Sequence, residues 1–574
     1  MTATTDPITL ALTGQLPAIL IVATLLALPT SLALLWLYRR AVLRSMRAAA
    51  PGVRSPPAPQ RPAPPSTPGQ PPDLTITSYD RDPKSYLEPS ARSFLAQLAR
   101  SRRRAAGAYA LGGAAFAVVM TSAFLVSSHI EFLPVRFLLL FWAYAWPVVF
   151  TTTLVLGSRL RTMLLCTAGY VAVYIGLGAI GMARSPTFDW GQAALFFAIN
   201  NLPASVLLMF FLNRRVRAVG PLVLVFMVLA VTGATVMVAL TGSSERLMRA
   251  AVRAGSAVGL QATGIFVGLH LLGFLLLGIV GWLALLWIRR RYERKRVSDE
   301  SLTFDAIWLL FGVDQSIGLA FEGAWWVLSG VVAFAAYKLV TALALSAATR
   351  SDRDAPNIRL LLLRVFALGR RSERLLEAVG AYWRHAGSIQ LIAGPDLITK
   401  VVEPHEFLDF LRGRLARRFV DGPETLERRV SEMDLERDHD GRFRVNEFFC
   451  HDDTWRAVLA RLVSHGDTIL MDLRSFSPAN AGVTFELEAL LNQVRLERVV
   501  FAIDRTTSRE YLGEVVEQAC GRLGPTSPNL GRPVRLRLME VEGSNSDIEP
   551  LLGALCAAAT ASPVPDPSPT GALQ

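Results

Sequence analysis

The residues with the clearest chemical potential lie where an apolar run ends in the C-terminal third of the chain. Segment 468–491, TILMDLRSFSPANAGVTFELEALL, passes from that run into a helical pattern carrying Glu486. A carboxylate there could stabilise positive charge at a reacting centre, hold a sugar hydroxyl or act as a nucleophile. Alternatively, Glu486 only stabilises the N-terminal part of its helix, through the interaction of its negative charge with the helix dipole. Glu486 is the best single candidate for chemistry.

The elements that position Glu486 belong to an α/β domain that begins near residue 351. Strand-like apolar runs alternate with amphipathic helical sequence, which predicts a mainly parallel five-stranded sheet covered on both faces. In the last run, Val534 and Leu536 alternate with Arg535 and Arg537, as expected of an edge strand with one wet face. The five runs are 358–368, 388–393, 468–473, 498–503 and 534–541.

A flavodoxin-like strand order, 2-1-3-4-5, would place the topological switch point between the first and third strands. A ligand crevice is expected beyond the C-terminal ends of these two strands, where arginines could pair with phosphate oxygens of a nucleotide. An alternative is that the arginines are solvated loop residues. The residues that would face one another there are Gly369, Arg370 and Arg371 on one side and Asp472, Arg474, Ser475 and Ser477 on the other.

Two segments of this domain resemble the TIR (Toll/interleukin-receptor) fold and its toll-like relatives. LLLRVFALGRRSERLLEAVG, residues 361–380, is similar to the first strand and loop of that family. DLRSFSPANAGVTFEL, residues 472–487, resembles its third strand and the helix that carries a glutamate. In the enzymatic members this glutamate supports cleavage between nicotinamide and ribose in NAD, and the matching residue is Glu486. The resemblance implies NAD as a candidate substrate, no certain cofactor, and homo-oligomers formed through the α/β domain.

The chain departs from the family pattern at three places. Thr484 and Phe485 precede Glu486 where the family has a Trp-Cys pair, Asp472 and Arg474 stand near the usual strand-end serine, and residues 420–449 are additional. Nucleoside deoxyribosyltransferase-like proteins share the architecture and also use a carboxylate against an N-glycosidic bond. The substrate therefore stays open.

The sequence before residue 351 is that of a multi-pass membrane protein. The whole chain is 52% hydrophobic and 18% charged, which is too apolar for a protein surrounded by water. Seven segments are long enough to cross a bilayer, and residues 301–346 supply either two more crossings or a re-entrant segment. The seven are 16–38, 105–127, 134–156, 162–182, 190–212, 219–240 and 262–288.

The net charge of +12 arises largely from arginines near the ends of these segments, so no nucleic-acid partner is expected. Under the positive-inside rule, the α/β domain lies in the cytoplasm and the spans lie in the inner (plasma) membrane. An even number of crossings in 301–346 is then required. Arg246, Arg249 and Arg253 fall outside and violate the rule.

The resulting organisation has five parts. They are a membrane anchor (1–50), a proline-rich linker and cytoplasmic segment (51–100), the polytopic region (101–350), the α/β domain (351–562) and a disordered tail (563–574).

Three functions are compatible with this organisation: an NAD-hydrolysing or nucleotide-binding membrane protein, a non-catalytic receptor or scaffold, and a transporter with a regulatory domain that uses Asn200, Asn201 or Lys338. Residues 436–447 match an EF-hand loop in part, but an Asp-Gly turn is the preferred interpretation, and no metal site is predicted.

Overall fold

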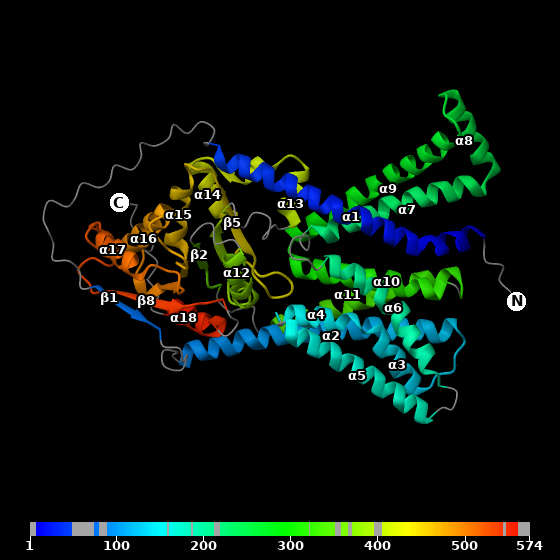
Figure 1. The fold of residues 1–574 in the computed structure, drawn as a ribbon, viewed down its shortest axis with the longest axis horizontal. Coiled ribbons are helices and arrows are strands. Elements are labelled where there is room, and N and C mark those ends of the chain that lie inside the picture. The colour runs from blue at the N-terminus through cyan, green and yellow to red at the C-terminus, as the bar shows by residue number, and fades with distance from the viewer. Residues whose placement is uncertain are drawn as a thin grey trace, which may run out of the picture.

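The chain folds into a bundle of long apolar helices and an α/β domain, which lie at opposite ends of the molecule (Figure 1). Gly369, the proline-rich run 51–72 and the tail 563–574 lie outside the residues that the structure describes. The computed structural model describes residues 7–48, 74–79, 89–157, 160–184, 188–211, 219–320, 322–350, 357–364, 370–394, 404–543 and 547–560.

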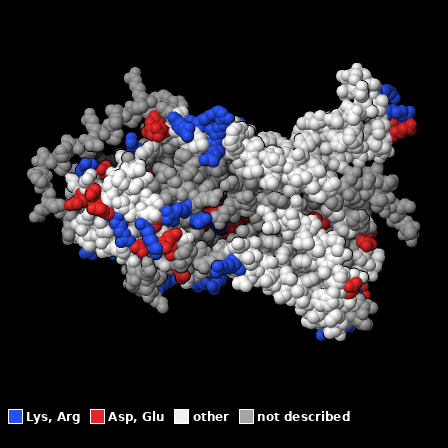
Figure 2. Space-filling view, in the orientation of Figure 1, with Lys and Arg blue, Asp and Glu red and all other residues white. Residues whose placement is uncertain are grey.

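Eight helices of the described chain are long and apolar enough to cross a membrane, so the predicted multi-pass region is confirmed. Figure 2 shows few charged side chains over the middle of the bundle. The helices are α1 (Pro7–Arg47), α2 (Pro89–Ser127), α5 (Leu160–Arg184), α6 (Trp190–Phe211), α7 (Gly220–Ser243), α9 (Ala262–Glu293), α10 (Asp299–Ala320) and α11 (Leu328–Thr349).

The span predicted over 134–156 is a bent pair of helices. α3 (Pro134–Tyr144) and α4 (Pro147–Val155) meet at 53°, and the pair together is apolar enough to cross. Pro147 lacks an amide hydrogen and cannot continue the hydrogen-bond ladder of α3, which accounts for the break. Counted as one span, the pair raises the number of crossings to nine.

The segment that the sequence left open forms two helices of spanning length, α10 and α11, joined by the short helix η2 (Ala324–Val327). A charged side chain inside an apolar helix requires a protein partner. Lys338 Nζ lies 2.7 Å from Asp305 Oδ2, and Asp314 Oδ2 accepts a 3.3 Å hydrogen bond from the Ala204 amide beside Pro203. The acidic residues of α10 therefore face the bundle at these two positions.

Small residues allow the closest helix crossings. A Cβ atom added to Gly233 of α7 would lie 2.3 Å from the Gly273 carbonyl oxygen of α9, and one added to Gly330 of α11 would lie 2.1 Å from the Gly312 carbonyl oxygen of α10. Any side chain at these positions would separate the backbones. Close backbone packing of this kind drives helix association in membranes.

The three arginines that break the charge rule lie on α8 (Glu245–Ala257), a short helix between α7 and α9 at the end of the bundle far from the α/β domain (Figure 1). Leu247 is 51% exposed and Met248 is 42% exposed, and together they lie on the opposite side of this helix from the arginines. An amphipathic helix of this kind lies along a membrane surface and does not cross it.

The α/β domain contains one sheet, and every strand pair in its described part is parallel. The order is β1-β8-β7-β6-β2-β3-β5-β4. The strands are β1 (Leu74–Ser78), β2 (Leu360–Arg364), β3 (Ile389–Ile392), β4 (Phe419–Val420), β5 (Val445–Cys450), β6 (Thr468–Asp472), β7 (Val499–Ile503) and β8 (Val534–Glu540).

All five expected strands are present, and their expected order is confirmed by the neighbours β3, β2, β6, β7 and β8. The expected number was wrong, because β1, β4 and β5 bring the described sheet to eight strands. The expectation that β8 is the edge strand was also wrong, because β1, from the segment assigned as linker, pairs along it. The alternation of buried Val534 with exposed Arg535 arises because one face of β8 is exposed to solvent.

Helices cover both faces of the sheet, as predicted. The apolar side chains of α15 (Trp455–His465), α16 (Ala481–Gln493) and α17 (Arg509–Cys520) form one core with the sheet, together with Leu426 of α14 (Pro423–Ser431). The other face packs against α12 (Arg370–Trp383), α18 (Ile548–Thr560) and Leu98 of α2. The remaining short helices are α13 (Pro404–Leu411), η4 (Leu415–Arg418) and η5 (Leu496–Arg498).

Two membrane helices continue without a break into the α/β domain. α2 has 39 residues, and the Arg102 guanidinium at its junction with the domain lies 3.8 Å from the ring centre of Tyr382. Near the end of α1, Tyr38 and Val42 pack against Phe407 of α13. The attachment of the two parts is therefore a packed apolar contact on two sides.

Buried hydrogen bonds complete this attachment, and on the α/β side they come from the additional segment 420–449. Arg444 Nη2 donates to the Tyr292 carbonyl oxygen of α9 at 2.7 Å and also lies 2.7 Å from Asp438 Oδ1. Asp440 accepts a 2.5 Å hydrogen bond from Ser298 Oγ, before α10. Asp438 and Asp440, which matched calcium-loop positions, thus bind protein groups, and Gly441, with φ +81°, lies in the predicted turn.

Replacing Arg444 with methionine is expected to lower the stability of the α/β domain by about 3 kcal/mol, because the buried Asp438 carboxylate loses its partner. Thermal unfolding of the full-length protein in detergent measures the change. Arg428→Met is the matched control, since the Arg428 side chain is 52% exposed on α14. Equal unfolding midpoints for the two variants would contradict the assigned role of Arg444.

Candidate functional site

The C-terminal ends of β2 and β6 form the centre of the candidate site. Arg364 ends β2 and Asp472 ends β6, and the two residues are aligned partners. β3 adds to one side of β2 and β6 to the other, so the direction of chain crossover reverses here. Ligands of open parallel sheets bind at such a point. The strand order therefore has its switch point between the two strands that the sequence predicted.

Arg474 and Asp472 form a buried ion pair at this edge. Both side chains are 1% exposed, and Arg474 Nη2 lies 2.7 Å from Asp472 Oδ2 while Nε lies 2.7 Å from Oδ1. Arg474 Nη2 also donates to the Arg371 carbonyl oxygen at 3.1 Å. Two of the predicted site residues are thus brought together with a third, and the buried pair fixes the start of α12.

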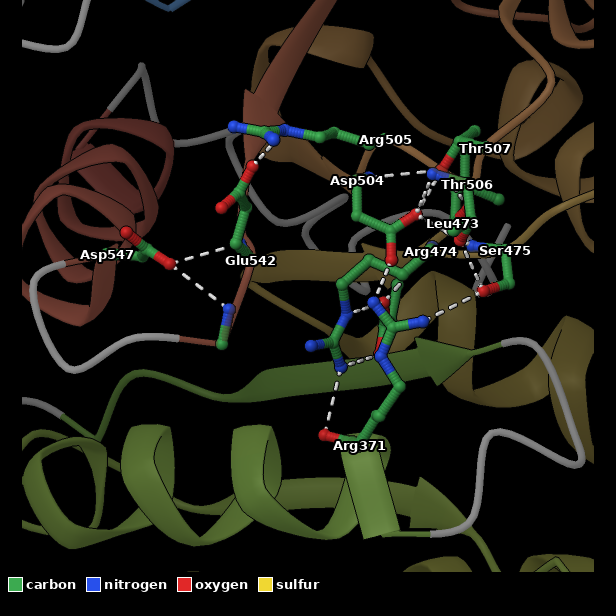
Figure 3. Close-up of polar contacts among 12 residues, drawn as sticks. Arg371, Leu473, Arg474, Ser475, Asp504, Arg505, Thr506, Thr507, Glu542 and Asp547 are labelled. Atoms are coloured by element: carbon green, nitrogen blue, oxygen red, sulfur yellow. Dashed lines mark hydrogen bonds and ion pairs between the residues drawn. The ribbon is translucent and has the colours of Figure 1, made fainter.

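Arg371 is the exposed member of the same network (Figure 3). Its guanidinium donates to Ser475 Oγ at 3.1 Å and pairs with Asp504, the residue that follows β7. Burial of Asp504 opposes its charge, but hydrogen bonds from Thr506 and the Ser475 amide, together with the Arg371 charge, outweigh it and lower the pKa of the Asp504 carboxyl. Asp504 is therefore an ionised anchor for Arg371.

Ser475 has a backbone conformation that L-residues rarely adopt, with φ +58°. Its amide donates to Asp504 Oδ1 at 3.2 Å, and its hydroxyl lies 2.6 Å from Thr506 Oγ1. The strained turn is thus held by hydrogen bonds on two sides. Such strain is concentrated at functional sites, where neighbouring groups fix it.

The remaining predicted binding residues are Ser477, Arg370 and Gly369. Ser477 is half-buried and donates to Asn480 Oδ1 through both its amide, at 3.0 Å, and its hydroxyl, at 3.1 Å, so it shapes the turn before α16. Arg370 begins α12, and its side chain is outside the described part of the molecule, as is Gly369.

Glu486 lies in the second turn of α16 and is 2% exposed. It shares the core-facing side of that helix with Val483 and Leu487. Within the described chain its Oε2 atom has no hydrogen-bond partner. Burial raises the pKa of the Glu486 carboxyl to about 8, although the positive charge of Arg364 acts in the opposite direction. At neutral pH most Glu486 side chains are therefore protonated.

The sheet separates Glu486 from the arginine network. Glu486 belongs to α16, on the face covered by α15 and α17, whereas Arg371 belongs to α12, on the other face. A ligand that used both groups would have to lie across the edge where β2 and β6 end.

Sequence reasoning missed Arg364, Asp504 and Thr506. Arg364 interrupts an otherwise apolar strand, and a charge in a buried run is a signal of a functional or paired residue. Asp504 and Thr506 follow the fourth expected strand directly, in DRTTS. The same strand-end rule that selected Asp472 would have selected them, because the predicted order already made that strand a neighbour of the third.

Of the two asparagines considered for a transport path, Asn201 connects helices in the bundle. Asn201 Nδ2 donates to the Ala143 carbonyl oxygen of α3 at 3.2 Å, and its Oδ1 accepts from Gln315 Nε2 of α10 at 3.3 Å. These contacts favour helix packing as the role of Asn201. Asn200 Nδ2 donates to the Phe196 carbonyl oxygen of its own helix at 2.9 Å.

Comparisons of the chain with protein-family models, with curated proteins and with solved structures found no match. The chemistry assigned to the site therefore rests on its residues and their arrangement.

Replacing Glu486 with glutamine is expected to make the protein more stable than the wild type at alkaline pH. The unfolded carboxyl ionises near its ordinary pKa of 4.5, while the folded one stays protonated until about pH 8. Ionisation of the unfolded state therefore lowers wild-type stability between these pH values, by at most about 5 kcal/mol, and glutamine removes this loss.

Thermal unfolding of the full-length protein between pH 5 and pH 9 measures this difference. The gain in unfolding midpoint should grow with pH and level off above about pH 8. Glu488→Gln is the matched control on the same helix, because Glu488 is paired with Arg522 at 3.1 Å near the surface. A pH-independent difference between Glu486→Gln and the wild type would contradict the raised pKa.

Proposed function

We propose that this multi-pass membrane protein binds a nucleotide at the edge formed by β2 and β6 and hydrolyses the N-glycosidic bond of NAD. The observation that carries the proposal is the buried Glu486 carboxyl with a raised pKa on α16, the helix that follows β6 from the topological switch point. A buried titratable group at a ligand-binding edge is a typical catalytic arrangement. The TIR resemblance supports the choice of NAD.

In this proposal the arginine network binds phosphate. Arg371 is 42% exposed and lies beside the Ser475 and Thr506 hydroxyls, so a guanidinium and two hydroxyl groups can meet a pyrophosphate. The buried Arg474–Asp472 pair positions Arg371 through the hydrogen bond from Arg474 to the Arg371 carbonyl oxygen. Gly369, Arg370 and Ser477 complete the proposed binding segment.

The reaction breaks the bond between the ribose C1′ carbon and the nicotinamide nitrogen, and the bonding pair leaves with nicotinamide. The positive charge that develops on the ribose is stabilised by the ionised Glu486 carboxylate. Water then attacks C1′ and loses a proton to solvent, giving ADP-ribose. Because the carboxylate is the active form, the rate should follow the ionisation of Glu486.

We assign the α/β domain to the cytoplasm and the helices to the inner membrane. Exposed arginines gather where α1 and α9 leave the bundle toward the α/β domain, at Arg39, Arg40, Arg290 and Arg294. Positive residues mark the cytoplasmic ends of membrane helices.

The full-length protein in detergent is expected to release nicotinamide from NAD. The value of kcat/KM should rise with pH and level off near pH 8, because burial raises the pKa of Glu486. Glu486→Gln should lower kcat at least about 100-fold, the usual effect of losing one group that stabilises developing charge. Chromatography of released nicotinamide measures both quantities.

Glu488→Gln serves as the control in this assay as well and should keep the wild-type rate. Equal rates for Glu486→Gln and the wild type would remove Glu486 from the mechanism. If neither protein released nicotinamide at any pH from 6 to 9, the hydrolase proposal would be wrong.

A non-catalytic receptor that signals through assembly of its α/β domain is the second candidate. β1 supports it, because it lies at the end of the strand order and its Ile76 side chain is 40% exposed. An exposed edge strand can pair with a second chain. The Tyr79 amide bonds to the Leu538 carbonyl oxygen, so by alternation the Ile76 amide points away from β8.

Ile76→Pro is then expected to weaken self-association of the full-length protein about tenfold, since proline removes the outward amide hydrogen. Ile76→Ala is the control, because it keeps the amide while shortening the side chain. Light scattering over a range of protein concentrations measures the association. A monomeric wild type would exclude this candidate.

A further inference from the structure

Seven exposed arginines lie where α1 meets the α/β domain. Figure 2 shows a dense group of basic side chains at this place. We call these residues the arginine collar. Its members are Arg39, Arg40, Arg44 and Arg47 of α1 together with Arg412, Arg414 and Arg417 of the segment from α13 to η4.

Apolar packing brings the two halves of the collar together, although they are far apart in the sequence. The rings of Tyr38 and Phe410 lie 5.4 Å apart in an edge-to-face arrangement. Val42 and Met46 belong to the same apolar cluster as Leu415. The arginines on α1 and those around η4 therefore flank one shared core.

The position of Trp36 places this core at the membrane surface. Trp36 is 57% exposed on the outside of α1, and the Arg40 guanidinium lies 5.4 Å from its ring centre. An exposed tryptophan followed by a basic residue is typical of the boundary between lipid and water. Tyr38, which packs against α13, lies only about 3 Å further along the helix axis.

The residues of α9 independently indicate the same position for the membrane surface. Trp287 is 56% exposed, and the Arg291 guanidinium lies 4.7 Å from its ring centre. Arg289, about 3 Å beyond Trp287 along the axis, forms an ion pair of 2.9 Å with Asp409 of α13. Two helices thus place α13 and η4 at the depth of the lipid headgroups.

No carboxylate of the described residues forms an ion pair with any of the seven collar arginines, so their positive charge is not neutralised by the protein. The nearest acidic residue on α13, Asp409, binds Arg289 and Arg418 instead, the latter at 2.7 Å. Glu406 is 3% exposed and points into the protein. A surface of this charge at headgroup depth complements phosphate.

We infer that the arginine collar binds the phosphate groups of anionic lipids in the leaflet that faces the α/β domain. Arginines at the end of α1 alone would serve membrane topology. Arg412, Arg414 and Arg417 belong to the α/β domain, so they attach that domain to the membrane surface. The inference does not depend on the proposed enzyme activity.

Hydrogen exchange of the full-length protein in nanodiscs tests the inference. The two discs contain phosphatidylcholine alone or phosphatidylcholine and phosphatidylglycerol in equal parts. Phosphatidylglycerol should slow amide exchange in residues 404–418 several-fold, and high salt should remove the effect, because exposed charges are screened. The triple variant Arg412→Gln, Arg414→Gln, Arg417→Gln should show equal exchange in both discs.

A second triple variant, Arg495→Gln, Arg532→Gln, Arg535→Gln, removes the same charge from other exposed positions of the domain and should keep the lipid effect. Loss of the phosphatidylglycerol effect in both variants would show that it depends only on the net charge of the domain, which would contradict a lipid site at the collar. Persistence in the collar variant would overturn it as well. Equal slowing by inorganic phosphate with phosphatidylcholine discs would show a general anion site and not a lipid site.

Discussion

The ends of the membrane helices impose the constraint on which the rest of the structure depends. A helix leaves carbonyl groups at its C-terminus that need donors and favour positive charge. Residues in and directly after the additional segment supply them: Arg444 donates to the Tyr292 carbonyl near the end of α9, and His451 Nδ1 lies 2.7 Å from the Ser45 carbonyl near the end of α1. The α/β domain thereby caps two helices, and its position follows from theirs.

The N-terminus of α10 is stabilised in the corresponding way, but there the favoured charge is negative. Asp299 is the first residue of α10, where negative charge is favoured, and it receives both guanidinium nitrogens of Arg384 at 2.9 Å. Arg384 directly follows α12, and Arg371 near the other end of α12 belongs to the candidate site. One helix, α12, thus joins the membrane junction to the candidate site.

Hydrophobic pattern and strand order were predictable because they depend on periodicity and on general rules of chain crossover. The five main strands, their order and the meeting of Arg371, Asp472, Arg474 and Ser475 follow from these rules. β1 was not predictable, since five residues with one partly buried leucine carry little pattern and pair with a strand that lies far away in the sequence. Arg444 was missed because a charged loop looks solvated until its partners on another part of the chain are known.

Helix-dipole stabilisation alone does not account for Glu486. A carboxylate that favours the start of a helix does so in its ionised form, and the interaction would lower its pKa. Glu486 lies instead in the second turn, faces the core and has a pKa raised by burial. Placing a carboxyl there costs stability whenever it ionises, and an apolar side chain would pack in the same position without that cost. Departures from simple packing rules of this kind are expected at functional sites, which favours a role in ligand chemistry over one in helix formation.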